Sequence, residues 1–149
     1  MIEFQKATDK DAEVLARISK RAFHSDVEIG GPEADGPPGY DSARWQSRMM
    51  GLADYYKILL NGHIVGGLIL SRMRPQEYEL RRVFIDPEVQ RQGIGTQACE
   101  FLWKTYPLAK RWKLDTPAWN VRTRRFYAKM GFVEIGENEH GLILFERQL

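Results

Sequence analysis

The sequence predicts an α/β fold: one central mixed sheet, mostly antiparallel and of about seven strands, flanked by about four helices. Early apolar runs follow one another with a hairpin turn between them, which predicts antiparallel neighbours. Later apolar runs alternate with segments of helical periodicity, which indicates a parallel step. The chain has 149 residues, 43% of them hydrophobic, enough for one core and not for two. We therefore expect a single domain over residues 1–149.

The composition excludes several classes of function. Lys and Arg number 22 against 20 Asp and Glu, and this balance does not predict a nucleic-acid-binding protein. One cysteine and three scattered histidines predict neither a disulfide nor a metal site. The first residues lack an apolar signal segment, and no apolar run is long enough for a membrane span. We expect a cytoplasmic protein with no nucleic-acid or membrane partner.

The chain begins with a short strand and a helix. Residues 2–6 alternate between apolar and polar side chains, as a half-buried strand does. Thr8 and Asp11 have the spacing of a capping box, and apolar residues then recur at helical intervals. An amphipathic helix from Thr8 to about Phe23 is the prediction.

Residues 25–41 form a different kind of segment, with four glycines, three prolines and five carboxylates but no Lys or Arg. One interpretation is a solvated, mobile loop. The other is an acidic wall that selects a cationic substrate. A short helix over residues 42–52 follows, and its Trp45 is the tryptophan that we expect to touch a substrate.

The middle of the chain reads as a run of antiparallel strands. Tyr55–Leu60 and Ile64–Ser71 are apolar runs with Asn61-Gly62 between them, and both turn residues tolerate positive φ. Glu77–Ile85 is the next strand. The remaining prediction is a helix from Gly93 to before Pro107, a strand at Leu114, a helix over Asn120–Met130, and a closing hairpin of Phe132–Ile135 and Leu142–Glu146.

The stretch Gln90-Arg91-Gln92-Gly93-Ile94-Gly95 lies between a predicted strand and a predicted helix. Glycines let the backbone approach a ligand closely, and the free N–H groups at a helix N-terminus favour an anion. We interpret this stretch as a turn that binds phosphate or pyrophosphate. The alternative is a loop that needs small residues for packing alone.

Three classes of phosphate-binding turn compete for this stretch. The P-loop requires Lys after its second glycine, but Gly95 is followed by threonine. A Rossmann turn fits Gly93, Gly95 and Ala98, with Asp115 lying 20 residues beyond Gly95. Its glycine should follow the strand almost at once, however, and seven residues intervene here. A nucleotide-binding oxidoreductase fragment thus stays as an alternative.

The third class fits at every position. Residues 83–95, VFIDPEVQRQGIG, closely resemble the coenzyme A motif of the GNAT superfamily of N-acetyltransferases, whose core is Q/R-x-x-G-x-G/A. A second motif of that family is present as Asn120, then Phe126-Tyr127, then Gly131-Phe132. The resemblance covers essentially the whole chain and is strongest over residues 77–133. It implies a GNAT-like fold.

The resemblance also implies acetyl-CoA as cosubstrate. In the family, the strand before the turn splays from its neighbour, and its unpaired backbone binds the pantetheine arm as an added strand would. The residues that match this strand are Val83, Phe84 and Ile85. Those that match the pyrophosphate turn are Gln90, Arg91, Gln92, Gly93, Ile94, Gly95 and Thr96. Asn120 matches a residue that hydrogen-bonds pantetheine, although it is also placed to cap a helix.

For catalysis, the resemblance implies Tyr127 as the general acid that protonates the departing thiolate. Its alternative role is that of a core tyrosine on an amphipathic helix. A backbone N–H around Phe84 or Ile85 would hold the oxyanion. Supplementary charge near the phosphates would come from Arg91, Arg122, Arg124 and Arg125.

The general base has several candidates. Family members often carry a glutamate where Glu79 falls, and strand alternation places Glu79, Arg81, Val83 and Ile85 on one face. An ion pair of Glu79 with a neighbouring arginine is the alternative role. Asp115, at the end of the next strand, is the second candidate. The third is no protein base at all, since a fraction of the amine is always neutral.

The sequence thus predicts an N-acetyltransferase that moves the acetyl group of acetyl-CoA to a primary amine by direct transfer in a ternary complex. The acidic segment 25–41 suggests a small cationic amine. The alternatives are acetylation of a protein N-terminus or lysine, and a CoA-binding regulatory module without turnover. Members of the family are often dimers, so a homodimer is a further partner to consider.

Overall fold

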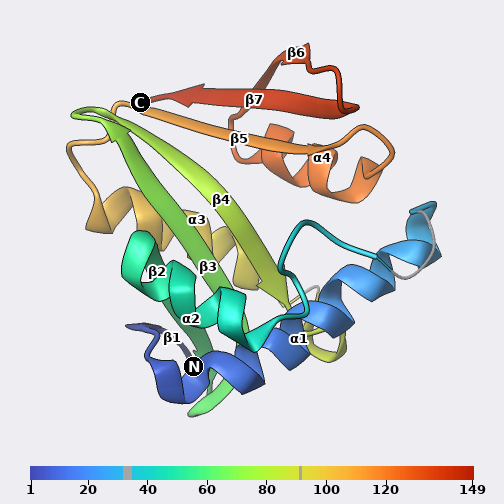
Figure 1. Ribbon diagram of the computed structural model, residues 1–149. Coiled ribbons are helices and arrows are strands. Elements are labelled where there is room, and N and C mark those ends of the chain that lie inside the picture. Colours follow the sequence, from blue (N-terminus) through green and yellow to red (C-terminus); the bar gives the residue numbers. More distant parts are fainter. Residues whose placement is uncertain (32–34, 91) are drawn as a thin grey trace.

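The computed structural model describes residues 1–31, 35–90 and 92–149. Seven strands of these residues form one sheet in the order β1-β2-β3-β4-β5-β7-β6 (Figure 1). Their bounds are β1 Ile2–Lys6, β2 Asp54–Leu60, β3 His63–Arg74, β4 Glu77–Ile85, β5 Arg111–Pro117, β6 Val133–Glu137 and β7 Leu142–Gln148. Every neighbouring pair is antiparallel except β4 and β5, which are parallel. The predicted mixed, mostly antiparallel sheet is confirmed.

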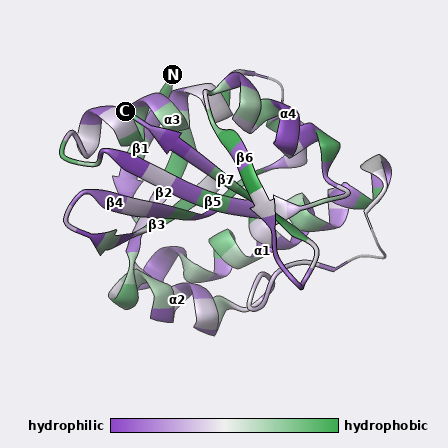
Figure 2. Cartoon of the chain, turned by 90° about the horizontal axis from the view of Figure 1, so that it is seen from above, coloured by the Kyte–Doolittle hydropathy of each residue, from purple (hydrophilic) through white to green (hydrophobic). Residues whose placement is uncertain are grey.

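Four α-helices of the described residues cover the sheet, and they divide between its faces. Their bounds are α1 Ala12–His24, α2 Ala43–Leu52, α3 Ile94–Thr105 and α4 Val121–Lys129. Figure 2 shows α1 and α2 on one face and α3 and α4 on the other. Leu15, Ile69 and Phe84 belong to the core under α1 and α2. Leu68 and Leu102 belong to the core under α3 and α4. No helix within the described residues is long and apolar enough to cross a membrane.

Local sequence signals account for several of these boundaries. Asn61 and Gly62 both have positive φ, 51° and 83°, as the two-residue hairpin between β2 and β3 requires. The capping box of Thr8 and Asp11 is present. It opens a short 3-10 turn, however, and the α-helical part begins only at Ala12.

The acidic segment differs from the prediction at its start. Residues 25–29 continue from α1 as a 3-10 helix, which ends at Gly30 with a left-handed φ of 96°. Glycine adopts this conformation without the steric cost that a side chain brings. The carboxylate of Asp26 is thereby placed on an ordered element beside α1 and not on a loop. Glu33 of the same segment lies outside the described residues.

The feature that creates the site is the divergence of β4 and β5. Their ladder pairs only Glu77–Glu79 with Arg111–Lys113. Beyond it β4 runs on to Ile85 and β5 to Pro117, and Figure 1 shows the two strands separating. On its other side β5 stays paired with β7 along its full length. The sheet therefore opens at one place, between β4 and β5.

Candidate functional site between β4 and β5

A cavity of about 690 Å³ fills the space between the diverging strands. One wall is β4 from Leu80 to Ile85, and the opposite wall is β5 from Leu114 to Pro117. The start of α3, α4 from Arg122 to Tyr127, the end of α1 and residues 35–38 also contribute to the lining. Because β4 has no ladder partner on its β5 side here, the backbone groups that point to that side are free to bind an extended ligand.

A β-bulge in β4 decides which side chains face which helices. The register between β3 and β4 shifts between Ile69, opposite Arg82, and Leu70, opposite Leu80. Leu80 consequently packs in the core under α3, whereas Phe84, four residues on, packs in the core under α1 and α2. In a regular strand, side chains four residues apart share a face.

The prediction that Glu79, Arg81, Val83 and Ile85 share one face is therefore wrong. Val83 packs against the cluster that contains Leu80, so it faces α3. Glu79 adjoins Leu80 before the bulge and thus points to the other face. Alternation fails because the bulge inserts one extra residue and reverses the faces beyond it.

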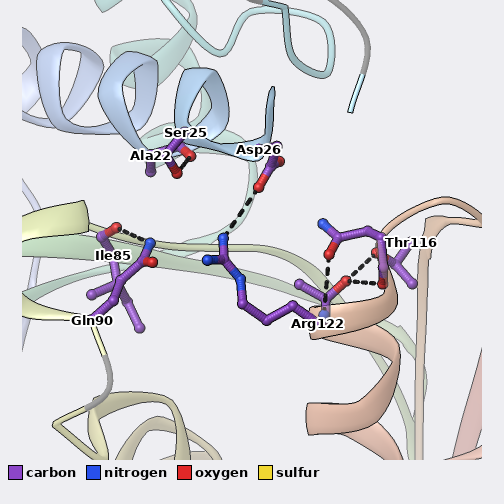
Figure 3. Close-up of polar contacts among 9 residues, drawn as sticks. Ala22, Ser25, Asp26, Ile85, Gln90, Thr116 and Arg122 are labelled. Carbon is purple, nitrogen blue, oxygen red and sulfur yellow. Dashed lines mark hydrogen bonds and ion pairs between the residues drawn. The ribbon is translucent and has the colours of Figure 1, made fainter. Parts of the chain in front are cut away.

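The turn before α3 has the geometry expected of an anion site. Gly93 has a left-handed φ of 75° and is the N-cap of α3. At Gly95 a Cβ would lie 3.0 Å from the ring of Phe126, so a side chain here would crowd the cavity wall. Gln90 donates from Nε2 to the Ile85 carbonyl at 3.1 Å, and this bond ties the turn to the end of β4 (Figure 3).

Two titratable groups with shifted pKa values belong to the cavity wall. Tyr127 comes from α4 and Asp115 from β5, and both line the space. Burial, followed by the proximity of Cys99 and Asp115, raises the pKa of Tyr127 above its usual value. Burial also raises the pKa of Asp115, against the opposing charge of Arg82. The phenol thus keeps its proton at neutral pH, and the raised pKa makes the Asp115 carboxylate a stronger base than an unperturbed aspartate.

An ion pair joins two residues of the cavity lining. Arg122, near the start of α4, donates to the Asp26 carboxylate at 3.4 Å, and Figure 3 shows the two side chains extended toward each other. Burial raises the pKa of Asp26, and the charge of Arg122 opposes the shift. Arg124, in contrast, is engaged away from the cavity by Glu134 and by the Ala118 carbonyl.

The side chain of Asn120 caps a helix with its oxygen and leaves its amide nitrogen without a hydrogen bond among the described residues. Its side-chain oxygen accepts from the Thr123 amide at 3.1 Å and caps α4. The side chain is also part of the cavity lining. Capping thus uses the oxygen, and the amide nitrogen makes no hydrogen bond to the described residues.

Comparison with known proteins identifies the family. The model of the Acetyltransferase (GNAT) family matches residues 17–132. The chain belongs to the GNAT acetyltransferase family. A Bacillus subtilis (strain 168) protein, YrkN, is 33% identical over 118 residues, which are 76% of this chain and 63% of YrkN. The match thus spans less than two thirds of the length of that relative.

Solved structures of GNAT proteins share the fold. The PaiA N-acetyltransferase from Thermoplasma acidophilum, in complex with coenzyme A, superposes with a TM-score of 0.84 at 17% identity, over 100% of this chain and 99% of its own. The ribosomal-protein-S18-alanine N-acetyltransferase from Escherichia coli superposes with a TM-score of 0.74 at 20% identity, over 99% of this chain and 94% of its own. At these identities the likeness concerns the fold.

Most of the residues that the sequence predicts for the site line the cavity between β4 and β5. Those that line it are Val83, Phe84, Ile85, Gln90, Gly93, Ile94, Gly95, Thr96, Asn120 and Tyr127. Glu79 and Gln92 do not belong to the lining, and Arg91 lies outside the described residues. Asp115, the second candidate for the base, does line it.

Sequence reasoning missed several residues of the cavity wall. Arg82 and Trp119 line it without belonging to either family motif, whereas residues 35–38, which also line it, belong to the acidic segment that the sequence offered as a wall for a cationic substrate. Trp45, expected to touch substrate, instead lies behind Arg82 with its ring centre 4.0 Å from the guanidinium carbon. The bulge, which turns Arg82 toward Trp45, has no signal in the sequence, because it depends on the register with β3.

Proposed function

We propose that this GNAT protein transfers the acetyl group of acetyl-CoA to a primary amine in a ternary complex. One observation carries the proposal. A single cavity joins the unpaired edge of β4, the glycine turn at the start of α3, and the two titratable groups Tyr127 and Asp115. A CoA-type ligand needs the free strand edge and the glycine turn. Acyl transfer to an amine uses a general acid and a general base, for which Tyr127 and Asp115 are available.

The cavity fits a CoA-type ligand in three ways. The free edge of β4 from Leu80 to Ile85 offers backbone partners to a pantetheine arm, which carries amide groups. The N-terminus of α3, opened by Gly93 in the left-handed conformation, presents N–H groups to a pyrophosphate. Absence of a Cβ at Gly95 leaves room beside Phe126. We assign the same roles to Val83, Phe84, Ile85, Asn120 and the turn 90–96, with Arg91 and Gln92 as members of the turn.

Acetyl-CoA supplies a thioester whose thiolate is the leaving group. We assign Tyr127 to protonate the departing sulfur, because its hydroxyl holds its proton at neutral pH and makes no hydrogen bond among the described residues. The tyrosine then regains a proton from solvent. Backbone N–H groups of β4 near Phe84 and Ile85 would stabilise the oxygen on which negative charge develops.

For the general base we favour Asp115 over Glu79. Asp115 lines the cavity, and burial raises its pKa toward the range where a carboxylate accepts protons effectively. Glu79 lies where β4 still pairs with β5, outside the lining. It forms no ion pair with Arg81 or Arg82 either, among the described residues. Asp115 would take the proton from the attacking amine directly or through water.

The charge of the cavity bears on the acceptor. Of the acidic segment's described carboxylates, only Asp26 and Asp35 line the cavity, and Asp26 is already paired with Arg122. We retain from the sequence the primary amine, which Asp115 and Asp35 can attract. A small cationic amine and the amine of a peptide or protein N-terminus or lysine are the two kinds of acceptor. The S18-alanine N-acetyltransferase of similar fold illustrates the second.

Thermal unfolding with acetyl-CoA, CoA or NAD tests the cofactor first. A ligand at about 100 times its Kd stabilises a protein by about 2.7 kcal/mol, which for this size is a Tm rise of roughly 5–10 °C. We expect the rise with acetyl-CoA and CoA but not with NAD. Thiol release from acetyl-CoA in the presence of amines then tests transfer.

Each other outcome identifies a different function. A rise with NAD alone would favour the nucleotide-binding oxidoreductase. A rise with acetyl-CoA but no thiol release with any amine or peptide would favour a CoA-binding regulatory module. No rise with acetyl-CoA, in protein shown to be folded, would contradict the proposal.

A further inference from the structure

Two contacts fix the guanidinium group of Arg82 on the cavity wall. Its Nη2 donates a hydrogen bond of 2.6 Å to the Pro38 carbonyl. Its central carbon lies 4.0 Å from the centre of the Trp45 ring. Stacking on an aromatic face holds the plane of a guanidinium and leaves its edge donors free for planar acceptors. Arg82 is therefore oriented before any ligand binds.

The partners of Arg82 are themselves held by buried contacts. The Trp45 ring lies against Gly39, where a Cβ would be 2.2 Å from the ring. Gln46 is fully buried and donates to the Gly39 carbonyl at 3.3 Å. Its side-chain oxygen in turn accepts from the Tyr55 hydroxyl on β2. This network connects the segment beside Pro38 to α2 and β2, and such support keeps a binding side chain in one geometry.

One donor of Arg82 has no partner. Its Nη1 is buried and makes no hydrogen bond among the described residues. Burial lowers the pKa of Arg82 to about 10, so the group stays positive at neutral pH. A buried charged donor without an acceptor is costly, and native proteins seldom retain one without a role for it. Any acceptor oxygen would satisfy this donor, and an anionic one would also compensate the charge of the guanidinium.

Asp115 faces Arg82 from the other wall but does not satisfy it. Both side chains line the cavity, and the charge of each acts on the other. No ion pair joins them in the part of the chain that the structure describes. The charges of the described lining also balance, as Asp26, Asp35 and Asp115 against Arg81, Arg82 and Arg122. An acceptor with several positive charges would gain little from this arrangement.

We propose that Arg82 binds a carboxylate of the acceptor, so that the acceptor is an amino acid or a similar small zwitterion. Its carboxylate would meet the guanidinium of Arg82, and its amine would face Asp115. A guanidinium and a carboxylate have matching planar geometry, which a simple amine cannot use. This inference rests on the proposed function, since it names the acceptor of the same site.

The first test uses the unmodified protein with acetyl-CoA and matched acceptors. Each of several α-amino acids is compared with its carboxamide and with the amine left after removal of the carboxyl group, by thiol release. We expect at least one amino acid to have a kcat/KM about tenfold or more above both counterparts, because a charge-assisted hydrogen bond contributes that much. Amines or amides that react as fast as every amino acid, or no reaction with any amino acid, would overturn the proposal.

The second test uses two variants of Arg82 and a control. Arg82→Gln should raise the KM for the preferred amino acid about tenfold or more and bring its advantage over the decarboxylated amine close to one. Arg82→Lys, which keeps the charge but loses the planar fork, should restore part of that advantage. Arg48→Gln, an exposed arginine of α2, should leave it unchanged. An advantage that persists in Arg82→Gln would contradict the assignment.

The Tm rise with acetyl-CoA separates the two proposals. If the rise is absent, the proposed function is wrong, and the inference about Arg82, which rests on it, is wrong as well. If acetyl-CoA binds and plain amines are acetylated while amino acids are not, only the inference about Arg82 fails. The same rise, measured for Arg82→Gln, shows that this variant is folded.

Discussion

The two ends of the β4–β5 pair behave differently although they belong to the same two strands. At the closed end, Glu77 contacts Lys113 at 3.0 Å and Arg111 at 3.9 Å. At the open end the strands share no ladder, and Asp115 and Arg82 face the cavity with no ion pair between them in the described residues. Glu77 at the closed end is thus paired with two cations, whereas Asp115 at the open end forms no ion pair with Arg82 among the described residues.

The same difference appears in the pKa values of one carboxylate from each end. The hydrogen bond from Lys113 lowers the pKa of Glu77 most. Burial raises this pKa, but the charges of Lys113, Arg74 and Arg111 lower it further, so it lies below its usual range. At the open end burial raises the pKa of Asp115 instead. A compensated carboxylate is a weak base, whereas a desolvated one accepts a proton more readily. The carboxylate that we propose as the general base thus lies where the strands part.

The largest expected effect is at the open end, in Tyr127→Phe. Loss of a general acid lowers rates by about 10²-fold or more, so kcat should fall by that amount while the KM for acetyl-CoA stays nearly constant. Steady-state thiol release measures both values. A kcat within about threefold of the unchanged protein would assign Tyr127 to packing against Phe126, Phe132 and Phe145.

The second effect compares one carboxylate from each end. Asp115→Asn should lower kcat/KM about tenfold or more, and Glu79→Gln should change it less than about twofold. Because the base must be deprotonated, activity of the unchanged protein should fall as the pH drops through the raised pKa of Asp115. This acidic limb should vanish in Asp115→Asn. A larger loss of kcat/KM in Glu79→Gln than in Asp115→Asn would indicate that Glu79 is the general base.

The third effect concerns cofactor binding. In Gly95→Val the new side chain meets the Phe126 ring, since even a Cβ would lie 3.0 Å from it. We expect the Kd for acetyl-CoA, measured by calorimetry, to rise about tenfold or more. Gly51→Ala in α2 is the matched control, because a Cβ there meets nothing within 4 Å. Similar Kd values for acetyl-CoA in both variants would show that the turn before α3 does not bind the cofactor.

The smallest effect is at the closed end. Glu77→Gln should lower the Tm slightly and leave kcat unchanged. Because the folded protein holds the pKa of Glu77 low, its contribution to stability is present above its unfolded pKa and is lost as pH falls through the folded pKa. The Tm of Glu77→Gln should therefore depend less on pH in the acidic range. A large fall in kcat would show that the closed end also takes part in catalysis.

The sequence predicts the fold well because its signals are local. The Asn61-Gly62 turn sets one hairpin, and Asn120 caps the helix that it was expected to begin. The glycine turn and Tyr127 could be placed in one site because two spaced motifs point to the same family. These features depend on neighbouring residues or on motif order.

The features that the sequence could not predict depend on pairing between distant segments. The bulge in β4 exists only in register with β3, and it moves Glu79 to the face opposite Val83. The same bulge turns Arg82 toward Trp45, which alternation does not predict. Trp119 reaches the cavity through the tertiary fold alone. The general base and the acceptor-binding side chain are consequently proposals that needed the structure.

Amide hydrogen exchange with and without acetyl-CoA tests the central claim, that the open end of β4 and β5 holds the cofactor. Free backbone N–H groups of β4 should gain a partner when pantetheine binds, and those of the α3 turn should gain a phosphate. We predict slower exchange at residues 80–85 and 93–96, by about tenfold or more, with little change at residues 77–79. Binding of acetyl-CoA with unchanged exchange at residues 80–85 and 93–96 would contradict the account.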